Sequence, residues 1–323
     1  MPKTYLITGG AGFIGSHLVD KLLDQGNNII CLDNFDDFYD PEIKRNNIKE
    51  ASKNTGFQLT EGDIRDRKTL DNCFRNGNID TVIHIAARAG VRPSIEKPEL
   101  YYDVNVRGTL TLLEAMKEYD VKKMIFASSS SVYGNNKKVP FSEDDNVDFP
   151  ISPYAATKKT CELMCHNYHH LYGFNIFCLR FFTVYGPRQR PEMAIHDFAR
   201  KIINGDKITL FGDGNSKRDY TYIDDIISGI TGAIDNLEGY EIINLGNSDT
   251  ITLNDLVRML EHATGEKAIT ERLPKQPGDV DITYADITKA RNLLGYNPQY
   301  PVERGLIEFV DWMMDVGLSR GGA

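Results

Sequence analysis

The chain of 323 residues carries 46 acidic against 37 basic side chains, a formal charge of −9, and is 41% hydrophobic and 26% charged. This composition is that of a soluble globular protein with one large or two modest domains, and the acidic balance disfavours nucleic acid as a partner. No apolar run approaches the ~20 residues of a membrane span, and the first strand candidate begins at residue 5, which leaves no room for a signal peptide. Five cysteines in apolar segments indicate reduced thiols, so we expect a cytoplasmic protein with no membrane partner.

The first predicted strand, residues 5–7, leads into a glycine-rich turn over residues 8–15 and then into an amphipathic helix. Glycines at this spacing allow a tight turn, close approach of the backbone to a pyrophosphate, and close packing of helix on strand. The helix that follows points its N-terminal amides at the phosphates. A tight turn without a ligand is the alternative, but the strand, helix and a later acid favour a dinucleotide site with Gly9, Gly12, Phe13, Ile14 and Gly15 as contacts.

The second apolar run, residues 28–32, ends in Asp33, some twenty positions after the glycine turn. A carboxylate there accepts hydrogen bonds from the ribose hydroxyls of a dinucleotide and repels a 2′-phosphate. Asn34 and Phe35 follow it, where an NADP site would favour arginine. A solvated strand end is the alternative for Asp33 alone. Together with the glycine turn, the acid predicts NAD as the cofactor.

Further strand and helix patterns alternate along the first ~180 residues. This order predicts an α/β fold, a doubly wound parallel Rossmann sheet whose ligands lie beyond the carboxyl ends of the strands. Glycines and prolines then break the chain into shorter pieces, which predicts a smaller C-terminal substrate-binding lobe. We expect an NAD-binding domain over residues 1–182, to which the chain returns at about 219–245, and a nucleotide-sugar-binding lobe over 183–218 and 246–323. The remaining strand candidates are 58–60, 81–85, 123–128, 175–180 and 241–245, and the helical stretches are 71–74, 99–119, 154–172 and 222–237.

Tyr154 and Lys158 stand four residues apart in a predicted helix, so their side chains share one face. A free phenol is a poor base at neutral pH because its reference pKa is about 10. A neighbouring ammonium group favours the phenolate, as does a nicotinamide cation. The pair therefore predicts a base for an alcohol whose carbon gives up hydride. Such pairs also occur by chance on ordinary helices, and the glycine turn upstream is what gives this one weight.

Cys161 and Cys165 lie one helical turn apart, with His166, His169 and His170 close behind. A metal site is one interpretation of this cluster. The other is a helix that packs small thiols inward and turns its histidines outward, and we expect this second arrangement and no metal.

The glycine turn, the serines after the fifth strand candidate and the Tyr-x-x-x-Lys pair together resemble the extended short-chain dehydrogenase/reductase family over essentially the whole chain. Later motifs resemble its nucleotide-sugar epimerases; they begin at Arg180 (RFFTVYGP), Phe211 (FGDG), Arg218 (RDY) and Pro277 (PGD). Finer segments resemble UDP-glucuronate 4-epimerases, beginning at Asp33 (DNFDDFYD), Ala89 (AGVRPS), Arg188 (RQRPEMA) and Gln276 (QPGDV).

The resemblance implies a role for each matching position. Ser129 would hydrogen-bond the reacting sugar hydroxyl, beside the catalytic Tyr154 and Lys158, which would also hold the cofactor. Asn105 would shape the site structurally, although an ordinary helix asparagine is an alternative. A homodimer through residues 99–119 and 154–172 is also implied. Further contacts implied are, for the cofactor, Asn34, Asp63, Ile64, Ala86 and Ala87, and, for a UDP-sugar substrate, Ser130, Ser131, Thr183, Arg218 and Asp279.

The same fold serves 4-epimerases, 4,6-dehydratases and decarboxylases, so positions 130 and 131 are used to choose among them. By resemblance, dehydratases carry Asp-Glu there and UDP-glucuronate decarboxylases a Glu before the valine, whereas this chain has two serines. The sequence therefore predicts an NAD-dependent 4-epimerase that interconverts UDP-glucuronate and UDP-galacturonate through a 4-keto intermediate. The alternatives are a UDP-glucose/UDP-galactose 4-epimerase, then another nucleotide-sugar dehydratase, decarboxylase or NAD(P)-dependent reductase, and a non-catalytic nucleotide sensor.

A uronate needs a cation or several donors for its carboxylate, and Arg190 is our candidate. The alternative is that Arg190 merely pairs with a neighbour such as Glu192. Arg88, Arg92 and Arg188 are further basic residues near these motifs, and the sequence does not rank them.

Overall fold

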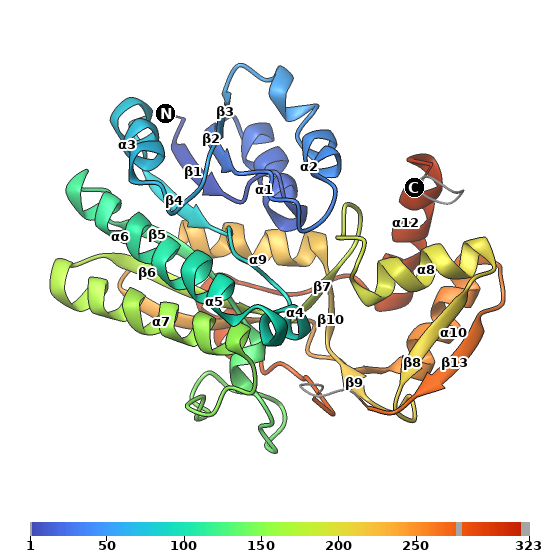
Figure 1. Cartoon of the computed structure of the whole chain (residues 1–323). Helices are drawn as coiled ribbons and strands as arrows, with labels where there is room; N and C mark the ends of the chain where they lie inside the picture. Colours follow the sequence, from blue (N-terminus) through green and yellow to red (C-terminus); the bar gives the residue numbers. More distant parts are fainter. Residues whose placement is uncertain (1, 276–279, 318–323) are drawn as a thin grey trace.

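A computed structural model describes residues 2–275 and 280–317 of the chain. Its centre is a seven-stranded sheet in the order β11-β6-β5-β4-β1-β2-β3, in which every neighbouring pair runs parallel (Figure 1). The predicted doubly wound parallel sheet is thereby confirmed. Its strands are β1 Thr4–Thr8, β2 Asn28–Asp33, β3 Phe57–Glu61, β4 Thr81–His84, β5 Lys123–Ser129, β6 Asn175–Phe181 and β11 Tyr240–Leu245.

Helices cover both faces of the sheet because successive strand residues point to opposite sides and both sides are apolar. In β1, Leu6 packs into the cluster under α3, α6 and α7, whereas Ile7 packs into the cluster that holds α1 and α9. The helices of the two layers are α3 Arg67–Gly77, α6 Gly108–Glu118 and α7 Pro153–Tyr172 on one face, and α1 Phe13–Asp24 and α9 Ile223–Asp235 on the other.

The helix expected over residues 99–119 is present as one continuous helical run, with a π-helical segment in its middle. The chain forms a short helix, α5 Pro98–Tyr101, then a π-helical segment, Tyr102–Arg107, and only then α6. Hydrophobic spacing does not separate a π-turn from an α-turn, because both bury one side of the segment. Such π-turns occur often at functional sites, and this one contains the buried Asn105.

Much of the chain after β6, apart from α9 and β11, builds a second lobe beyond the carboxyl ends of the strands (Figure 1). Its largest pieces are helices α8 Ala194–Asn204, α10 Leu253–Thr264 and α12 Val302–Asp315, which pack on a parallel pair of strands, β8 Lys207–Phe211 and β13 Ile269–Leu273. Its short strands are β9 Lys217–Arg218 and β12 Ile251–Thr252.

The remaining short elements lie elsewhere in the chain: α2 Pro41–Asn47, α4 Val91–Glu96, α11 Thr288–Leu294 and the 3-10 turns Ala51–Lys53 and Ser130–Tyr133.

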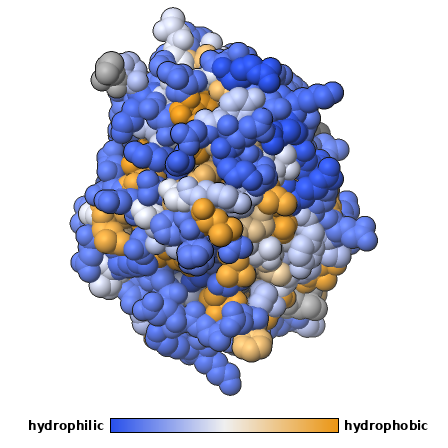
Figure 2. All heavy atoms as spheres, turned by 90° about the vertical axis from the view of Figure 1, so that its left-hand side faces the viewer, coloured by the Kyte–Doolittle hydropathy of each residue, from blue (hydrophilic) through white to orange (hydrophobic). Residues whose placement is uncertain are grey.

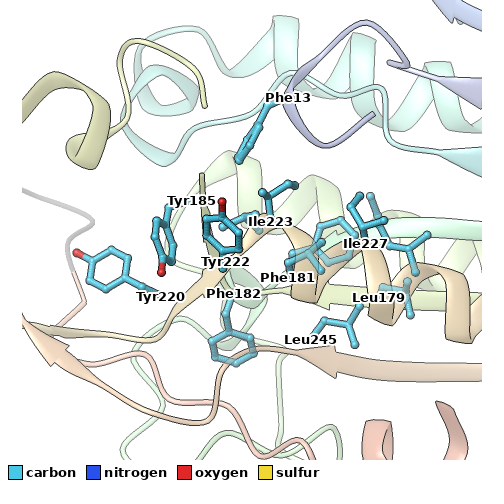
Figure 3. Packing of buried hydrophobic residues seen from close by; sticks show 14 of the residues in the cluster. Phe13, Leu179, Phe181, Phe182, Tyr185, Tyr220, Tyr222, Ile223, Ile227 and Leu245 are labelled. Atoms are coloured by element: carbon cyan, nitrogen blue, oxygen red, sulfur yellow. The ribbon is translucent and has the colours of Figure 1, made fainter. Parts of the chain in front are cut away.

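Sheet and lobe are joined by a short parallel pair, β7 Thr183–Tyr185 and β10 Tyr220–Tyr222. Around it Tyr185 and Tyr222 meet nearly edge to face, with ring centroids 5.5 Å apart (Figure 3). Phe182 and Ile223 continue this packing toward the sheet, so the junction is part of the main hydrophobic core. Aromatic packing of this kind fixes how the lobe sits over the strand ends.

Within the part of the chain that the structure describes, no helix combines the length and apolar character that crossing a membrane requires.

Candidate active site

A cleft with a volume of about 550 Å³ lies at the carboxyl ends of the strands, between the sheet and the second lobe. The structure brings together here every described residue that the sequence analysis assigned to the site; Asp279 lies outside the described residues. These lining residues are Gly9, Gly12, Phe13, Ile14, Gly15, Asp33, Asn34, Asp63, Ile64, Ala86, Ala87, Ser129, Ser130, Ser131, Tyr154, Lys158, Thr183, Arg190 and Arg218.

The glycine turn leaves no room for larger side chains at two of its positions. Gly9 has a φ of +71°, and a Cβ on it would lie 2.7 Å from the backbone nitrogen of Ala86. A Cβ on Gly15 would lie 2.1 Å from the carbonyl oxygen of Gly9. The backbone of the turn therefore packs tightly on both strand and helix, and the N-terminus of α1 faces the cleft as a pyrophosphate site requires.

The acid at the end of β2 is held by backbone amides. Asp33 accepts hydrogen bonds from the N–H groups of Ala11 at 3.1 Å and Phe35 at 2.9 Å. Burial raises the pKa of the Asp33 carboxyl, and these two N–H groups act against that rise. A carboxylate can accept about four hydrogen bonds, so Asp33 can still accept hydrogen bonds from ribose hydroxyls in the cleft. Glycine turn and acid thus fit NAD.

The Tyr154–Lys158 pair lies at the start of α7, where Ser152 caps the helix by accepting from the N–H of Ala155 at 3.1 Å. The ammonium group of Lys158 is buried and donates to the carbonyl oxygen of Ala127 at 2.5 Å. Because Ala127 belongs to β5, this bond ties the helix to the strand that ends in Ser129. Helix and strand thus aim the predicted acid–base residues into one cleft.

A buried ion pair lies directly beneath these residues. Glu162, one turn after Lys158, accepts from Nε and Nη2 of Arg180 at 2.8 and 2.9 Å. It also accepts from the hydroxyl of Ser128 at 2.7 Å. Arg180 lies over the ring of Tyr133 at 4.8 Å. Charged bonds thus join β5, β6 and α7 immediately behind Ser129.

Asn105 of the π-helical segment connects the opposite side of the site. Its amide oxygen accepts from the N–H of Arg88 at 2.7 Å, and its amide nitrogen donates to the hydroxyl of Thr157 at 3.0 Å. Thr157 precedes Lys158 in α7, so the π-turn holds the loop after β4 against the catalytic helix. These contacts are consistent with the structural role that the resemblance implied.

The structure ranks the four arginines that the sequence left unranked. Arg88 and Arg190 line the cleft, and both lie near the ring of Phe38, at 4.8 and 5.7 Å. Arg188 instead forms an ion pair with Asp20 of α1, and Arg92 lies over the ring of Phe211 of β8 at 4.7 Å.

Arg190 forms the ion pair with Glu192 that the sequence analysis gave as the alternative to a substrate contact. A carboxylate oxygen of Glu192 lies 3.3 Å from Nε of Arg190. The guanidinium nevertheless lines the cleft. On the lobe side, Arg218 lines the cleft and an adjoining hollow beside Phe211 and Lys275.

Beyond Asn34, the sequence analysis gave no site role to the segment after β2, although Asp36, Phe38, Tyr39 and Lys44 line the cleft. Asp36 pairs with Arg88, and the ammonium of Lys44 donates to the backbone oxygen of Asp36 at 2.7 Å. Further along, Asn47 donates to the carbonyl oxygen of Ala11 at 3.1 Å, which ties the segment to the glycine turn. The sequence did offer one signal for this segment: it directly follows β2, the strand that ends in Asp33, the acid assigned to the cofactor.

The cysteines of α7 pack inward. All five cysteines are free and buried, and burial raises the pKa of the Cys161 thiol to about 11. Among the residues that the structure describes, no group of three histidine, cysteine or acidic side chains is arranged to hold a metal ion.

The sequence profile of the GDP-mannose 4,6-dehydratase family matches residues 6–309. The chain belongs to this family. It is 46% identical over 309 residues to a UDP-glucuronate 4-epimerase of Thermodesulfobacterium geofontis, covering 95% of each chain. The predicted membership of the extended short-chain dehydrogenase/reductases is thereby confirmed.

Solved structures agree with this assignment. The UDP-glucuronic acid 4-epimerase of Bacillus cereus, in complex with UDP-glucuronic acid and NAD, superimposes with a TM-score of 0.92 at 39% identity, over 97% of this chain and 99% of that one. A UDP-glucose 4-epimerase of Thermotoga maritima, with UDP-glucose, gives 0.90 at 34% identity over the same shares. This family member is therefore similar to enzymes that act on either kind of sugar, and the choice between them rests on the site.

Proposed function

We propose that the protein is an NAD-dependent 4-epimerase that interconverts UDP-glucuronate and UDP-galacturonate. The observation that carries this proposal is the composition of one cleft: the Tyr154–Lys158 pair, serines at positions 130 and 131, and Arg190. The resemblance implies Asp-Glu at these two positions in dehydratases and a Glu before the valine in UDP-glucuronate decarboxylases, and this chain has neither carboxylate. The similarity to 4-epimerases, including one solved with UDP-glucuronic acid and NAD, supports the same assignment.

Bound NAD supplies the hydride acceptor for C4 and returns the hydride, so no net oxidation occurs and the cofactor stays with the enzyme. The glycine turn and the N-terminus of α1 hold its pyrophosphate, and Asp33 accepts from its adenosine ribose. Asn34 donates to the carboxylate of Asp63 at 3.2 Å, and these two residues with Ile64 close the adenine end. Ala86 and Ala87 border the path between the two ends of the cofactor.

Proton transfer falls to the residues at the end of β5 and the start of α7. Tyr154 as phenolate takes the proton of the C4 hydroxyl, and Ser129 hydrogen-bonds the same oxygen. The Lys158 ammonium stabilises the phenolate and is itself anchored to the carbonyl of Ala127. After the 4-keto sugar has turned its other face, Tyr154 returns the proton to the C4 oxygen, which completes the inversion.

The sugar carboxylate must be held, because a uronate with a ketone at C4 is a β-keto acid that loses CO2 readily. Ser130, Ser131 and Thr183 offer neutral donors on the strand side, and Arg190 offers a cation across the cleft. Arg218 meets the UDP pyrophosphate, since a planar guanidinium binds two phosphate oxygens at once. The sheet domain, residues 1–182 and about 219–245, thus binds NAD, and the lobe binds the nucleotide sugar.

The protein acts as a homodimer through the outer sides of α6 and α7. Leu110, Leu163 and Leu171 are large exposed apolar residues on these helices. The side of the molecule on which α6 and α7 end carries hydrophobic patches in a mostly polar surface (Figure 2). Five buried free thiols support a reducing compartment, and hence a cytoplasmic location.

The function is tested by incubating the purified protein with UDP-glucuronate and no added cofactor, and separating the products. Interconversion with UDP-galacturonate without CO2 release is expected. Conversion of UDP-glucose to UDP-galactose alone would reassign the substrate, UDP-pentose would indicate a decarboxylase, and stoichiometric formation of NADH a reductase.

The Tyr154→Phe variant should lose activity by about 10²- to 10⁴-fold, the range for a positioned acid–base group, while its bound NAD is retained. Tyr172→Phe, at the exposed end of the same helix, is the matched control and should leave the rate unchanged. An active Tyr154→Phe enzyme would contradict the assigned base.

A further inference from the structure

The loop that carries Arg190 is bonded directly to the helix that begins at the cofactor site. We call residues 186–190 the arginine loop. The imidazole of His17 in α1 donates from Nε2 to the carbonyl oxygen of Pro187 at 2.9 Å. One turn further along α1, Asp20 accepts from Nη1 of Arg188 at 2.7 Å. Two neighbouring residues of the loop are therefore held by one helix.

The other side of the arginine loop is fixed by the lobe. Gln189 is buried, and its amide nitrogen donates to the carbonyl of Val184 at 3.0 Å. His196 of α8 donates from Nδ1 to the carbonyl of Gln189 at 2.6 Å. Arg188 itself has a φ of +64°, a left-handed conformation that a non-glycine residue keeps only where its surroundings enforce it. The backbone leading to Arg190 is thus held on both sides.

The imidazole of His17 is neutral when it donates to the carbonyl oxygen of Pro187. Burial, with the nearby charge of Arg188, lowers the pKa of His17 to about 4. The ring therefore adds no charge that would compete with Arg188 for Asp20, and the two contacts act side by side. Phe13, which lines the cofactor part of the cleft, packs edge to face on the same imidazole with centroids 6.0 Å apart.

Arg190 has few constraints of its own beyond this loop. Its guanidinium lies 3.3 Å from Glu192 and 5.7 Å from the centre of the Phe38 ring, and about a fifth of its side chain is exposed. A long side chain held mainly by one partly exposed ion pair loses little energy when it moves. Its reach into the cleft consequently depends on where the backbone of the arginine loop lies.

We propose that His17 and Asp20 are positioning residues that hold the arginine loop against α1 and so place Arg190 at the carboxylate of the nucleotide sugar. The inference rests on the proposed function, since it presupposes a uronate in the cleft. It makes the cofactor-binding helix a part of substrate recognition, although neither side chain touches the sugar.

The test measures binding in the holoenzyme with turnover blocked by Tyr154→Phe. Titration calorimetry gives the dissociation constants of UDP-glucuronate and of UDP, which lacks the carboxylate. Asp20→Ala and His17→Leu should each weaken UDP-glucuronate by roughly five- to tenfold, as expected for loss of one charge-assisted or neutral hydrogen bond, and leave UDP unchanged. His17→Gln keeps an N–H donor and should restore most of the affinity.

The matched control is Asp71→Ala, which removes an Arg67–Asp71 pair of the same 2.7 Å length and similar exposure on α3. It should alter neither ligand. Bound NAD and the melting temperature are recorded for every variant, so that a folding defect is recognised by its effect on both ligands.

Arg190→Ala completes the series and should weaken UDP-glucuronate alone, by at least as much as the positioning variants. The inference is overturned if Asp20→Ala and His17→Leu bind like Asp71→Ala, if they weaken UDP and UDP-glucuronate equally, or if Arg190→Ala spares the uronate. Failure of the proposed function itself would show separately, as a wild-type enzyme with Tyr154 intact that does not interconvert the two uronates.

Discussion

The two sides of the cleft are built differently. The strand side presents Ser129, Tyr154 and Lys158 from the end of β5 and the start of α7, and the loop side presents Arg190 and Arg218. Behind the strand side lie bonds between fully buried groups, whereas the arginines of the loop side are partly exposed and reach acids or carbonyls near the surface. On the proposed function, we expect chemistry to rest on the more buried strand side and recognition on the more exposed loop side.

This comparison separates what mutations should do. Damage to the strand side should cost stability or rate, because its groups are ordered by the core. Damage to the loop side should cost affinity, because its groups are ordered mainly by the ligand and by a few polar contacts. The predictions below test that separation, beginning with the largest effect.

The strand side should fail most severely when its buried ion pair is broken. Glu162→Gln leaves the Arg180 guanidinium, of which about 1% is exposed, without a counter-charge in the core. Removing one partner of a buried pair typically lowers the free energy of unfolding by about 3–5 kcal/mol. Urea unfolding followed by circular dichroism measures the change.

Two further variants sharpen this result. Glu162→Met with Arg180→Met replaces the pair by apolar side chains of similar length and should recover most of the stability. Glu50→Gln removes the exposed Lys53–Glu50 pair and should leave the free energy of unfolding nearly unchanged. A Glu162→Gln protein as stable as Glu50→Gln would show that the core does not depend on this charge.

The loop side should respond to Arg218→Ala in affinity alone. Loss of charge-assisted hydrogen bonds to a pyrophosphate should weaken UDP and UDP-glucuronate together by about 10- to 100-fold. The turnover number at saturating substrate should stay near that of the wild type, because the proposal assigns Arg218 to the pyrophosphate and not to the proton transfer. Steady-state kinetics and calorimetry with both ligands measure this, with Arg272→Ala on the exposed strand β13 as the control. A fall in turnover number with unchanged affinity would place Arg218 on the chemical side instead.

The strand side was also the side that the sequence could predict. The glycine turn, Asp33 and the Tyr154–Lys158 pair follow local patterns, and parallel strands carry their ends to one edge of a sheet. Strand positions were therefore right to within a residue or two. The π-helical segment around Asn105 was missed because no local pattern distinguishes it from an α-helix.

The loop side depends on contacts between segments far apart in the sequence. Nothing local in His17 shows that it meets Pro187, 170 residues away, and the pairing of β7 with β10 is equally hidden. Arg88, Arg92, Arg188 and Arg190 could be named but not ranked, because each contacts a residue from a distant part of the sequence: Asp36, Phe211, Asp20 and Phe38, respectively. Such partners become visible only once the chain is folded.

The smallest effect concerns a buried histidine beneath the strand side. His84 of β4 lies between the hydroxyls of Thr8 at 2.7 Å and Thr109 at 3.0 Å, and burial lowers the pKa of its imidazole to about 3. The unfolded chain binds a proton near pH 6.5, whereas the folded protein does so only near pH 3, so stability is full above pH 6.5 and falls as the pH decreases. Between pH 7 and 5.5 this group should cost about 1 kcal/mol of unfolding free energy.

Buried acids with raised pKa, such as Asp219 at about 6, act in the opposite direction but do so equally in a variant. His84→Gln should therefore lose about 1 kcal/mol less than the wild type over this interval in urea unfolding, while His170→Gln, on an exposed turn of α7, should follow the wild type. Parallel curves for wild type and His84→Gln would mean that the histidine accepts its proton in the folded state, and that the strand side is less rigid than its buried bonds indicate.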